Sequence, residues 1–588
     1  MSRKGLPLVL FVAACGGTAA VATAPTPAGV ARGNGIVWPD EGPATWAPRP
    51  TEAAITANDM RTRLYQISDD SMQGRRIGEP GNYTATAYIA HEFERMGLKP
   101  GGPNGSFFQE LPYGPAVFDV AKSKLIAGGS TLQPRTDWIP MAPAGTSVIG
   151  PEANVQDAPA VFAGRWGDTT KVLDREKFAG KVAVFTAPPP SGGRGGGRGG
   201  GGGSFATVRD NRPVTAGVAA ILVISLDSMP RGTVNGAFSP RSMMQSAATG
   251  PAQSVGAAAI SSAAATKLFG SAGVEGLEIG AVGRSVSASW HFDWKMSATP
   301  ARNVIAILPG SDPARATQYV LVGAHNDHVG INNTVVDHDS LRAYNRVIRP
   351  QGANDPVRTP SADEQRRIDS MIAYARSIRP PRRDSIMNGA DDDGSGTAVL
   401  LEIAERFSTE KPARSIIFVS HQGEEAGLLG SRWFVDHPTV PLDSVVAAHN
   451  MDMLGKGRAS DVKFGGPTSV QTLGSRRRSR EFGEIIDSVN AVTKEPMAID
   501  RSWDVPANPM NRFCRSDQVN YVRAGIPVTY FSLGYSIDYH MQTDEARYVD
   551  FDHSARLARF IHDVMTAVAN RRDRPSFANP DTTLPSCR

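Results

Sequence analysis

Short apolar runs alternate with amphipathic segments through the second half of the chain. Five runs are rich in β-branched and aromatic residues, as buried strands are. They lie at residues 303–308, 319–322, 415–420, 445–448 and 527–531. Residues 396–407 and 552–568 instead repeat apolar positions at helical spacing. This alternation predicts an α/β fold with a mostly parallel, mixed sheet sandwiched between helices.

Two further amphipathic segments come earlier in the chain. Residues 53–67 and 85–96 carry apolar side chains at helical spacing, and the second segment stops at Gly97 and Pro100. Both are predicted helices. The stretch 70–75 between them is polar, and its composition predicts only a loop.

The region from about residue 115 to 294 has a different pattern. Short β-rich runs at 160–163, 181–185 and 219–224 alternate with turns. Residues 191–203 are almost all glycine, which predicts a mobile exposed loop because such a run cannot pack. No paired carboxylates or histidines stand out here. We therefore expect an inserted, non-catalytic, β-rich domain.

The N-terminus has the pattern of a targeting segment. A basic start at residues 3–4 precedes an apolar run at 8–14 that is too short to span a bilayer. Two processing sites compete: residues 12–15 resemble a bacterial lipobox that would leave a lipid on Cys15, and residues 22–24 resemble an ordinary signal-peptidase site. Both predict an exported protein, either periplasmic or secreted. A lipid on Cys15 is the only membrane attachment that we expect.

Composition narrows the class of protein. A length of 588 residues predicts at least two domains. The formal net charge of +4 is too small to argue for nucleic-acid binding, and we expect none. The three cysteines have no zinc-finger spacing, so a metal must be held by histidine and carboxylate ligands. Cys514 and Cys587 could pair in an oxidising compartment.

Candidate metal ligands follow the predicted strands of the second half. They fall in five stretches: residues 323–328, 388–396, 424–425, 450–453 and 539–544. Each stretch alone has an ordinary explanation, such as a surface turn, a helix cap or a calcium loop. Together they are specific, because open α/β sheets bind ligands at the carboxyl ends of their strands. The pattern predicts two metal ions that share a carboxylate.

The ordered motifs resemble a known family of peptidases. GAHNDH, GADDDGSG, GEEAGLLGS, NMDM and YHMQTD, in this order, are similar to the co-catalytic di-zinc aminopeptidases of metallopeptidase clan MH. That family includes bacterial leucyl aminopeptidases, aminopeptidase Y and glutamate carboxypeptidase II. The resemblance covers about residues 51–115 and 300–570, including the 70–75 loop. The inserted region resembles, more loosely, a protease-associated (PA) domain.

The resemblance implies a role for each matching residue. It implies that five side chains hold two zinc ions per chain: His325, Asp392, Glu425, Asp452 and His540. Asp392 bridges the ions, and Asp327 orients His325. Glu424 acts as the general base on a water that bridges the zinc ions. The family also implies a cis peptide bond between Asp392 and Asp393.

Two features depart from the family pattern. Gln518 stands where the family often has a histidine after Ser-Asp, and Phe513 stands where some members place an oxyanion-stabilising tyrosine. Four tyrosines could replace it: Tyr521, Tyr530, Tyr535 and Tyr539.

A long insertion at residues 331–387 carries many arginines and a helical piece at 363–377. It predicts either a lid whose arginines meet a substrate carboxylate, or a solvated surface excursion.

These observations predict an exported zinc exopeptidase that acts on peptides, as an aminopeptidase. The alternatives are a carboxypeptidase or dipeptidase of the same fold, a glutaminyl cyclase, and a catalytically silent receptor-like or scaffold protein. The intact ligand set and Glu424 favour the enzyme. The predicted organisation is a targeting segment at 1–24, a linker at 25–50, peptidase parts at 51–115 and 299–570, a PA-like insertion at 116–298 and a tail at 571–588.

Overall fold

The computed structural model describes residues 37–141, 149–150, 152–168, 170–188, 210, 212–245, 255–505 and 512–577. The targeting segment, the Gly-rich run at 191–203 and Cys587 lie outside the described residues. Cys514 is buried and disulfide-bonded. Its pairing with Cys587 stays a prediction.

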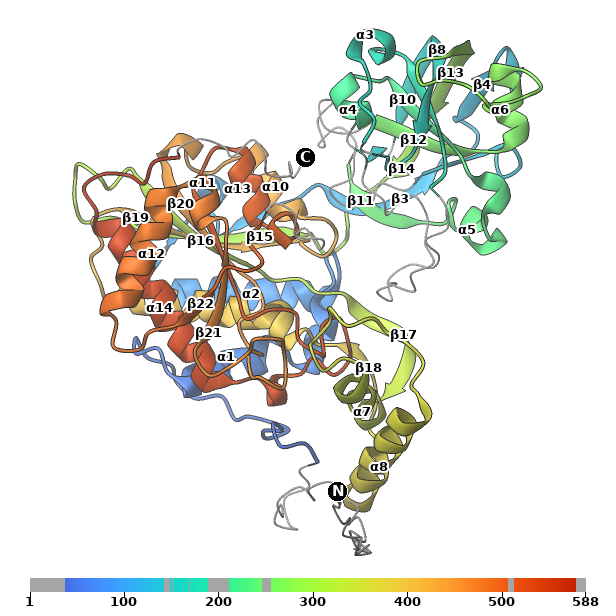
Figure 1. The fold of residues 1–588 in the computed structure, drawn as a ribbon. Helices are drawn as coiled ribbons and strands as arrows, with labels where there is room; N and C mark the ends of the chain where they lie inside the picture. The colour runs from blue at the N-terminus through green and yellow to red at the C-terminus, as the bar shows by residue number, and fades with distance from the viewer. Residues whose placement is uncertain are drawn as a thin grey trace, which may run out of the picture.

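A nine-stranded mixed sheet organises one of the two bodies seen in Figure 1. Its order along the sheet is β1 (Lys99–Pro100), β15 (Arg302–Leu308), β19 (Ser415–His421), β16 (Tyr319–His325), β20 (Val445–Met451), β23 (Val528–Ser532), β21 (Ser469–Leu473) and β22 (Ala498–Asp500), with β2 (Phe108–Glu110) also beside β15. The four strands β19, β16, β20 and β23 run parallel. The predicted fold class is thereby confirmed, and all five predicted strands are present.

Helices cover both faces of this sheet. One face packs against α1 (Ala57–Ile67), α2 (Pro80–Arg95), α9 (Gly396–Ser408), α12 (Arg480–Val492) and α14 (Phe551–Asn570). The other face packs against α10 (Leu429–Asp436) and α13 (Gln518–Arg523), and α11 (Ser475–Arg478) lies beside β21 and β23. The central strands are buried on both sides, which explains their continuous apolar runs.

The helix starts differ slightly from the sequence prediction. The helix expected from residue 53 begins at Ala57, because the Thr56 side chain caps it by accepting a hydrogen bond from the Asp59 amide. The helix expected from residue 85 begins five residues earlier, with Pro80 in its first turn.

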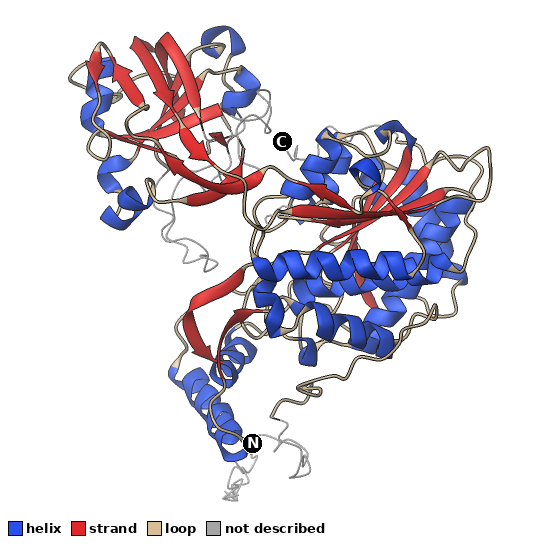
Figure 2. Cartoon of the chain, turned by 180° about the vertical axis from the view of Figure 1, so that it is seen from behind, coloured by secondary structure: helices blue, strands red, loops and turns tan. Residues whose placement is uncertain are grey.

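The middle of the chain forms a second body with its own sheets (Figures 1 and 2). Its main sheet has the order β5 (Ser130–Thr131), β4 (Lys124–Ala127), β13 (Val282–Trp290), β8 (Ala153–Arg165), β9 (Val182–Thr186), β10 (Ala220–Ile224), β12 (Val255–Ile260) and β6 (Trp138–Pro140), and β7 (Ile149–Gly150) pairs with β12. A smaller sheet joins β11 (Arg241–Met244), β3 (Tyr113–Phe118) and β14 (Phe292–Trp294). The helices here are α3 (Arg175–Phe178), α4 (Arg212–Ala216), α5 (Arg231–Gly236) and α6 (Ser262–Phe269). Its apolar clusters are separate from those of the first body.

The insertion at residues 331–387 forms an arm. β17 (Gly330–Asp337) and β18 (Arg383–Met387) pair antiparallel, and α7 (His338–Ile348) and α8 (Ala362–Ile378) join them. The arm extends away from the sheet in both views (Figures 1 and 2). Several of its arginines are ion-paired within the protein: Arg342 with Asp538, Arg379 with Asp339 and Arg382 with Glu545. These arginines are therefore not free to meet a substrate carboxylate.

No helix among the described residues combines the length and apolar content needed to cross a membrane.

Candidate metal centre and active site

The carboxyl ends of the parallel strands bring the predicted ligands together. β16 ends at His325, β20 ends just before Asp452, and Glu424 and Glu425 follow β19 by three and four residues. The register places His325 beside His421 and Gly323 beside Asn450, so these ends meet at one edge of the sheet. Loops from more distant parts of the chain add Asp392 and His540.

Two groups of ligand atoms form, and Asp392 belongs to both. His325, Asp392 and Asp452 make the first group, and His328, Asp392, Glu425 and His540 make the second. Within each group the ligand atoms lie within 4.8 Å of one another. All five predicted ligands are thus brought together, and His328 is an addition.

The distances show how Asp392 connects the groups. Its Oδ1 atom lies 3.2 Å from His325 Nε2, and its Oδ2 atom lies 3.0 Å from His540 Nε2. Asp452 Oδ1 lies 3.8 Å from His325 Nε2, and Glu425 Oε1 lies 2.9 Å from His540 Nε2. Each oxygen of Asp392 therefore faces a different group.

The chemistry of these atoms fits zinc. Several of them are buried and have no hydrogen-bond partner: His325 Nε2, His328 Nδ1 and Nε2, Glu425 Oε1, Asp452 Oδ1 and His540 Nε2. Buried polar atoms are ordinarily hydrogen-bonded, and leaving them unpaired costs free energy. Imidazole nitrogens and carboxylate oxygens are ligands that zinc accepts. A cation would satisfy the atoms that the protein leaves unpaired.

Only the middle acid of the Asp391–Asp393 triplet faces this centre. Asp391 Oδ1 accepts hydrogen bonds from the amides of Gly455 and Lys456, at 2.7 and 3.2 Å. Asp393 accepts from the His325 amide at 3.1 Å and the Met453 amide at 3.2 Å. The outer acids thus hold the backbone around the ligands. The Asp392–Asp393 peptide bond is cis, as the resemblance implied.

Asp327 acts on the site in a different way from the predicted one. The His325 Nδ1 atom lies 3.0 Å from the backbone oxygen of Asp327, whereas the Asp327 carboxylate is 3.7 Å away. That carboxylate accepts hydrogen bonds from the amides of Glu424 and Glu425, at 3.0 and 3.3 Å. Its backbone therefore orients the imidazole, and its side chain holds the turn that carries both glutamates.

His328 is the candidate ligand that the sequence reasoning missed. Its Nδ1 atom lies 2.8 Å from Glu425 Oε1, and its ring is fully buried beside His540. A glycine makes this possible, because a Cβ on Gly389 would come within 2.4 Å of the His328 ring. The available signal was the second histidine of the HNDH motif, three residues after His325.

Burial and neighbouring charges divide the acids of the centre into two kinds. Burial would raise the pKa of Asp392, but the imidazoles of His325 and His540 beside it hold that pKa well below its usual range. Burial likewise opposes ionisation of Glu425, yet the charge of His540 lowers its pKa to about 2. Burial raises the pKa of Glu424 well above its usual value. Asp392 and Glu425 are thus poised as anions, and Glu424 retains affinity for a proton.

The sequence of this part of the chain matches a defined family. Residues 303–565 match the model of peptidase family M28. This stretch is a peptidase family M28 domain. The predicted family is thereby confirmed for residues 303–565.

The chain is also similar to named relatives and to solved structures. The chain is 28% identical over 218 residues to a probable zinc metalloprotease of Pyrenophora teres, covering 33% of this chain and 43% of that protein. It is 29% identical over 194 residues to leucine aminopeptidase 1 of Trichophyton rubrum, covering 31% and 48%. The matched part thus spans about half the length of these relatives or less. A zinc aminopeptidase structure from Bacillus subtilis aligns at 16% identity with a TM-score of 0.42, covering 90% of this chain and all of that one.

The loop at residues 70–75 is more than the polar loop expected from composition. Arg75 is fully buried, and its guanidinium donates hydrogen bonds to backbone oxygens of Asn326, Asn388 and Gly389, at 3.0, 2.6 and 2.8 Å. These oxygens flank the ligand segments of His325 and Asp392. The loop therefore fixes the backbone on two sides of the centre, a role that only the fold reveals.

A buried lysine ties together three ligand-bearing segments of the M28 domain. Lys456 Nζ lies 2.7 Å from Asp544 and 3.1 Å from Asp538, on either side of His540. The Asp544 carboxylate in turn accepts from the amides of Asp391 and Asp392, at 3.1 Å each. Lys456 itself follows Asp452 by four residues. One charge network thus sets the mutual position of the Asp392, Asp452 and His540 segments.

The four tyrosines considered as replacements for Phe513 lie in different surroundings. The Tyr521 hydroxyl is 2.6 Å from His421 Nε2, and the Tyr530 hydroxyl is 3.5 Å from the backbone oxygen of Asp452. The Tyr539 ring stacks on His540 at 3.9 Å and contacts Tyr535 at 4.7 Å. Tyr521 is thus engaged with a histidine, and Tyr535 and Tyr539 line the side of the centre.

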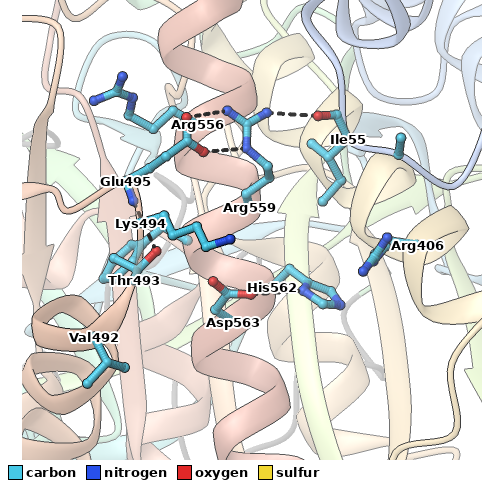
Figure 3. A pocket seen from close by; sticks show the side chains of 12 residues that line it. Ile55, Arg406, Val492, Thr493, Lys494, Glu495, Arg556, Arg559, His562 and Asp563 are labelled. Carbon is cyan, nitrogen blue, oxygen red and sulfur yellow. Dashed lines mark hydrogen bonds and ion pairs between the residues drawn. The ribbon is translucent and has the colours of Figure 1, made fainter.

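Two other features carry no chemistry that we assign. Figure 3 shows a hollow of about 490 Å³ in which Arg559 is already paired with Glu495, at 2.7 Å. Arg406, which lines this hollow, is ten residues along α9 from Gly396, or about 15 Å along the helix axis.

The other feature is a third ligand group of His338, Asp384 and Glu545 at the base of the arm. Arg382 and Arg547 already pair with Glu545, at 2.9 and 2.6 Å. Because two cations already neutralise this carboxylate, we assign no ion to the group.

Proposed function

We propose that the M28 domain is an exported exopeptidase that uses two zinc ions and acts as an aminopeptidase. One observation carries this proposal: two converging groups of unpaired histidine and carboxylate atoms share Asp392, with Glu424 beside them. The predicted targeting segment supports export. The leucine aminopeptidase among the relatives supports the choice of the amino terminus.

We assign each ligand to one of two ions. His325 and Asp452 would hold the first ion, Glu425 and His540 the second, and Asp392 would bridge them. His328 is a further ligand of the second ion. When bound, the zinc ions supply Lewis-acid activation of the scissile carbonyl and of the attacking water near neutral pH.

Glu424 is the proton carrier of the proposed mechanism. Its carboxylate is not part of either ligand group, and its raised pKa suits an acid that gains and loses a proton during turnover. It would accept the proton of the attacking water on one carboxylate oxygen. It would then deliver that proton to the departing amine.

The chain also holds Glu424 in place for this role. The Asp327 carboxylate binds the Glu424 amide at 3.0 Å, so the base is anchored to the loop that carries His325 and His328. The turn continues into α10, whose first residue is Leu429. The base is therefore tied by a hydrogen bond to the loop that carries two candidate ligands, which helps to preserve their geometry.

Product analysis by mass spectrometry tests the function. Zinc-loaded protein lacking residues 1–24 would be offered peptides with free and with acetylated amino termini, and Glu424→Gln would serve as the control. Release of single residues from free termini only, absent in the control, is the expected result. Cleavage that ignores acetylation and proceeds from the carboxyl end would instead establish a carboxypeptidase. Absence of any cleavage would favour a scaffold protein.

A further inference from the structure

Arg515 differs from the other arginines around the metal centre. Arg75 donates to backbone oxygens, Arg342 pairs with Asp538 at 2.7 Å, and Arg512 donates to Gln471 at 2.6 Å. Within the part of the chain that the structure describes, the Arg515 guanidinium makes no hydrogen bond or ion pair, and the residue is exposed. A cation without a counterion beside an active site is available to a ligand.

The backbone of Arg515 is nevertheless fixed. Ser516, the next residue, accepts a hydrogen bond from Asn450 at 2.8 Å, two residues before Asp452. Asp517 is fully buried and bonded to Ser431. The position of Arg515 is therefore set by the same sheet edge that sets the ligands, which distinguishes it from an arginine on a free surface loop.

A row of aromatic rings joins Arg515 to the metal centre. Its guanidinium carbon lies 5.1 Å from the centre of the Tyr535 ring, and Tyr535 lies 4.7 Å from Tyr539. Tyr539 stacks on the candidate ligand His540 at 3.9 Å. We call the rings of Tyr535 and Tyr539 the aromatic shelf. The shelf can pack against the methylene groups of a substrate side chain, and it lies between His540 and the Arg515 guanidinium.

Electrostatic interactions agree with this placement. The interaction with Tyr535, with further contributions from Tyr539 and Glu424, raises the pKa of Arg515. Burial raises the pKa of Tyr539, and the charge of Arg515 partly opposes that increase. The guanidinium is therefore within electrostatic reach of the proposed catalytic base and stays charged at every working pH.

We propose that Arg515 binds a carboxylate of the substrate, so that the M28 domain prefers peptides with an acidic residue at the scissile bond. This inference rests on the proposed function. The planar guanidinium matches a carboxylate with two parallel hydrogen bonds. The carboxylate is the side chain of an amino-terminal Glu or Asp, or the terminal carboxylate of a short peptide, and the substrates below distinguish these sources.

The test compares kcat/KM for the 7-amido-4-methylcoumarin derivatives of glutamate, leucine and lysine, which lack a peptide carboxylate. A second comparison measures kcat/KM for Leu-Gly and for Leu-Gly-amide, which differ only in the terminal carboxylate. Arg515→Gln is expected to lower kcat/KM for the glutamyl substrate by about 10- to 100-fold, mainly through KM, because the charge-assisted pairing with the substrate carboxylate is lost. The kcat/KM of this variant for the leucyl substrate is expected to stay within about 3-fold of the wild-type value, because the contacts with Tyr535 and Tyr539 remain.

Further variants separate specificity from general damage. Arg515→Lys should retain part of the glutamyl preference, and Arg515→Glu should shift the preference toward the lysyl substrate. Arg367 is an exposed arginine on α8. Arg367→Gln removes a charge of the same sign and should leave kcat/KM unchanged for every substrate. Loss of a Leu-Gly preference over its amide, with no effect on the glutamyl substrate, would assign Arg515 to the terminal carboxylate.

Two results would overturn the inference while leaving the function intact. One is unchanged selectivity in Arg515→Gln, which would make Arg515 a solvated surface residue. The other is an equal loss on all substrates, which would make it a support for Glu424. A wild-type protein that cleaves none of these substrates would overturn the inference and the proposed function together.

Discussion

At the residue scale, the candidate metal centre is marked by buried histidine and carboxylate atoms that have no hydrogen-bond partner. Most acids near the centre accept backbone hydrogen bonds, as Asp391 and Asp393 do. The buried atoms left unpaired within the two ligand groups include His325 Nε2, Glu425 Oε1 and His540 Nε2. Glu424 belongs to neither ligand group, and burial raises its pKa well above its usual value.

The first prediction concerns Glu424. Glu424→Gln keeps the shape of the side chain but cannot accept a proton, so kcat should fall by about 100- to 10,000-fold. Zinc content, measured by atomic emission, should be unchanged because Glu424 is not a ligand. Turnover near that of the wild type would remove Glu424 as the base.

The second prediction concerns His328. His328→Ala removes one ligand of the second group, so the affinity for the more weakly held zinc ion should fall by at least about 10-fold. Competition for zinc with a chelating dye would measure this affinity. His437→Ala, a change in an exposed histidine outside both groups, is the control. Equal zinc affinity in the two variants would show that His328 is no ligand.

At the scale of elements, the loops after the strands are held by charge networks. Arg75 clamps the loops around Asn326 and Gly389. Lys456 bridges Asp538 and Asp544, and Arg342 from α7 of the arm pairs with the same Asp538. The arm thus contributes to the support of the His540 loop.

The third prediction tests the lysine network. Lys456→Met leaves buried carboxylates without their cation, so the free energy of unfolding should fall by about 3–5 kcal/mol. Zinc affinity should fall as well, since the His540 loop loses its anchor. Lys463→Met, at an exposed lysine, should change neither denaturant midpoint nor zinc content. Identical midpoints for the two variants would contradict a role for Lys456.

At the scale of the whole molecule, two bodies have separate apolar cores. The first is built around the M28 sheet, and the second around the sheet of β8, β9 and β10. The ligand groups all lie in the first body. The assignment of the second body to a PA domain, and the domain boundaries, stay predictions.

The fourth prediction follows from this division. Zinc binds only the folded M28 body, so free zinc at about 100 times its dissociation constant should stabilise that body by about 2.7 kcal/mol. Calorimetry should resolve two transitions, of which a chelator lowers only one. A chelator-induced shift of both transitions would show that the two bodies unfold as one unit.

The sequence by itself determined the α/β fold class, the five central strands, and the five predicted metal-ligand candidates with Glu424 beside them. It could do so because buried strands leave continuous apolar runs, and because ligands at strand ends stand next to those runs in the chain. Tertiary structure alone decided the placing of His328 beside Glu425, the burial of Arg75 and the network around Lys456. Their partners lie tens to hundreds of residues away, so no local pattern records them. It also decided that Arg342, Arg379 and Arg382 are ion-paired, whereas the Arg515 guanidinium has no such partner among the described residues.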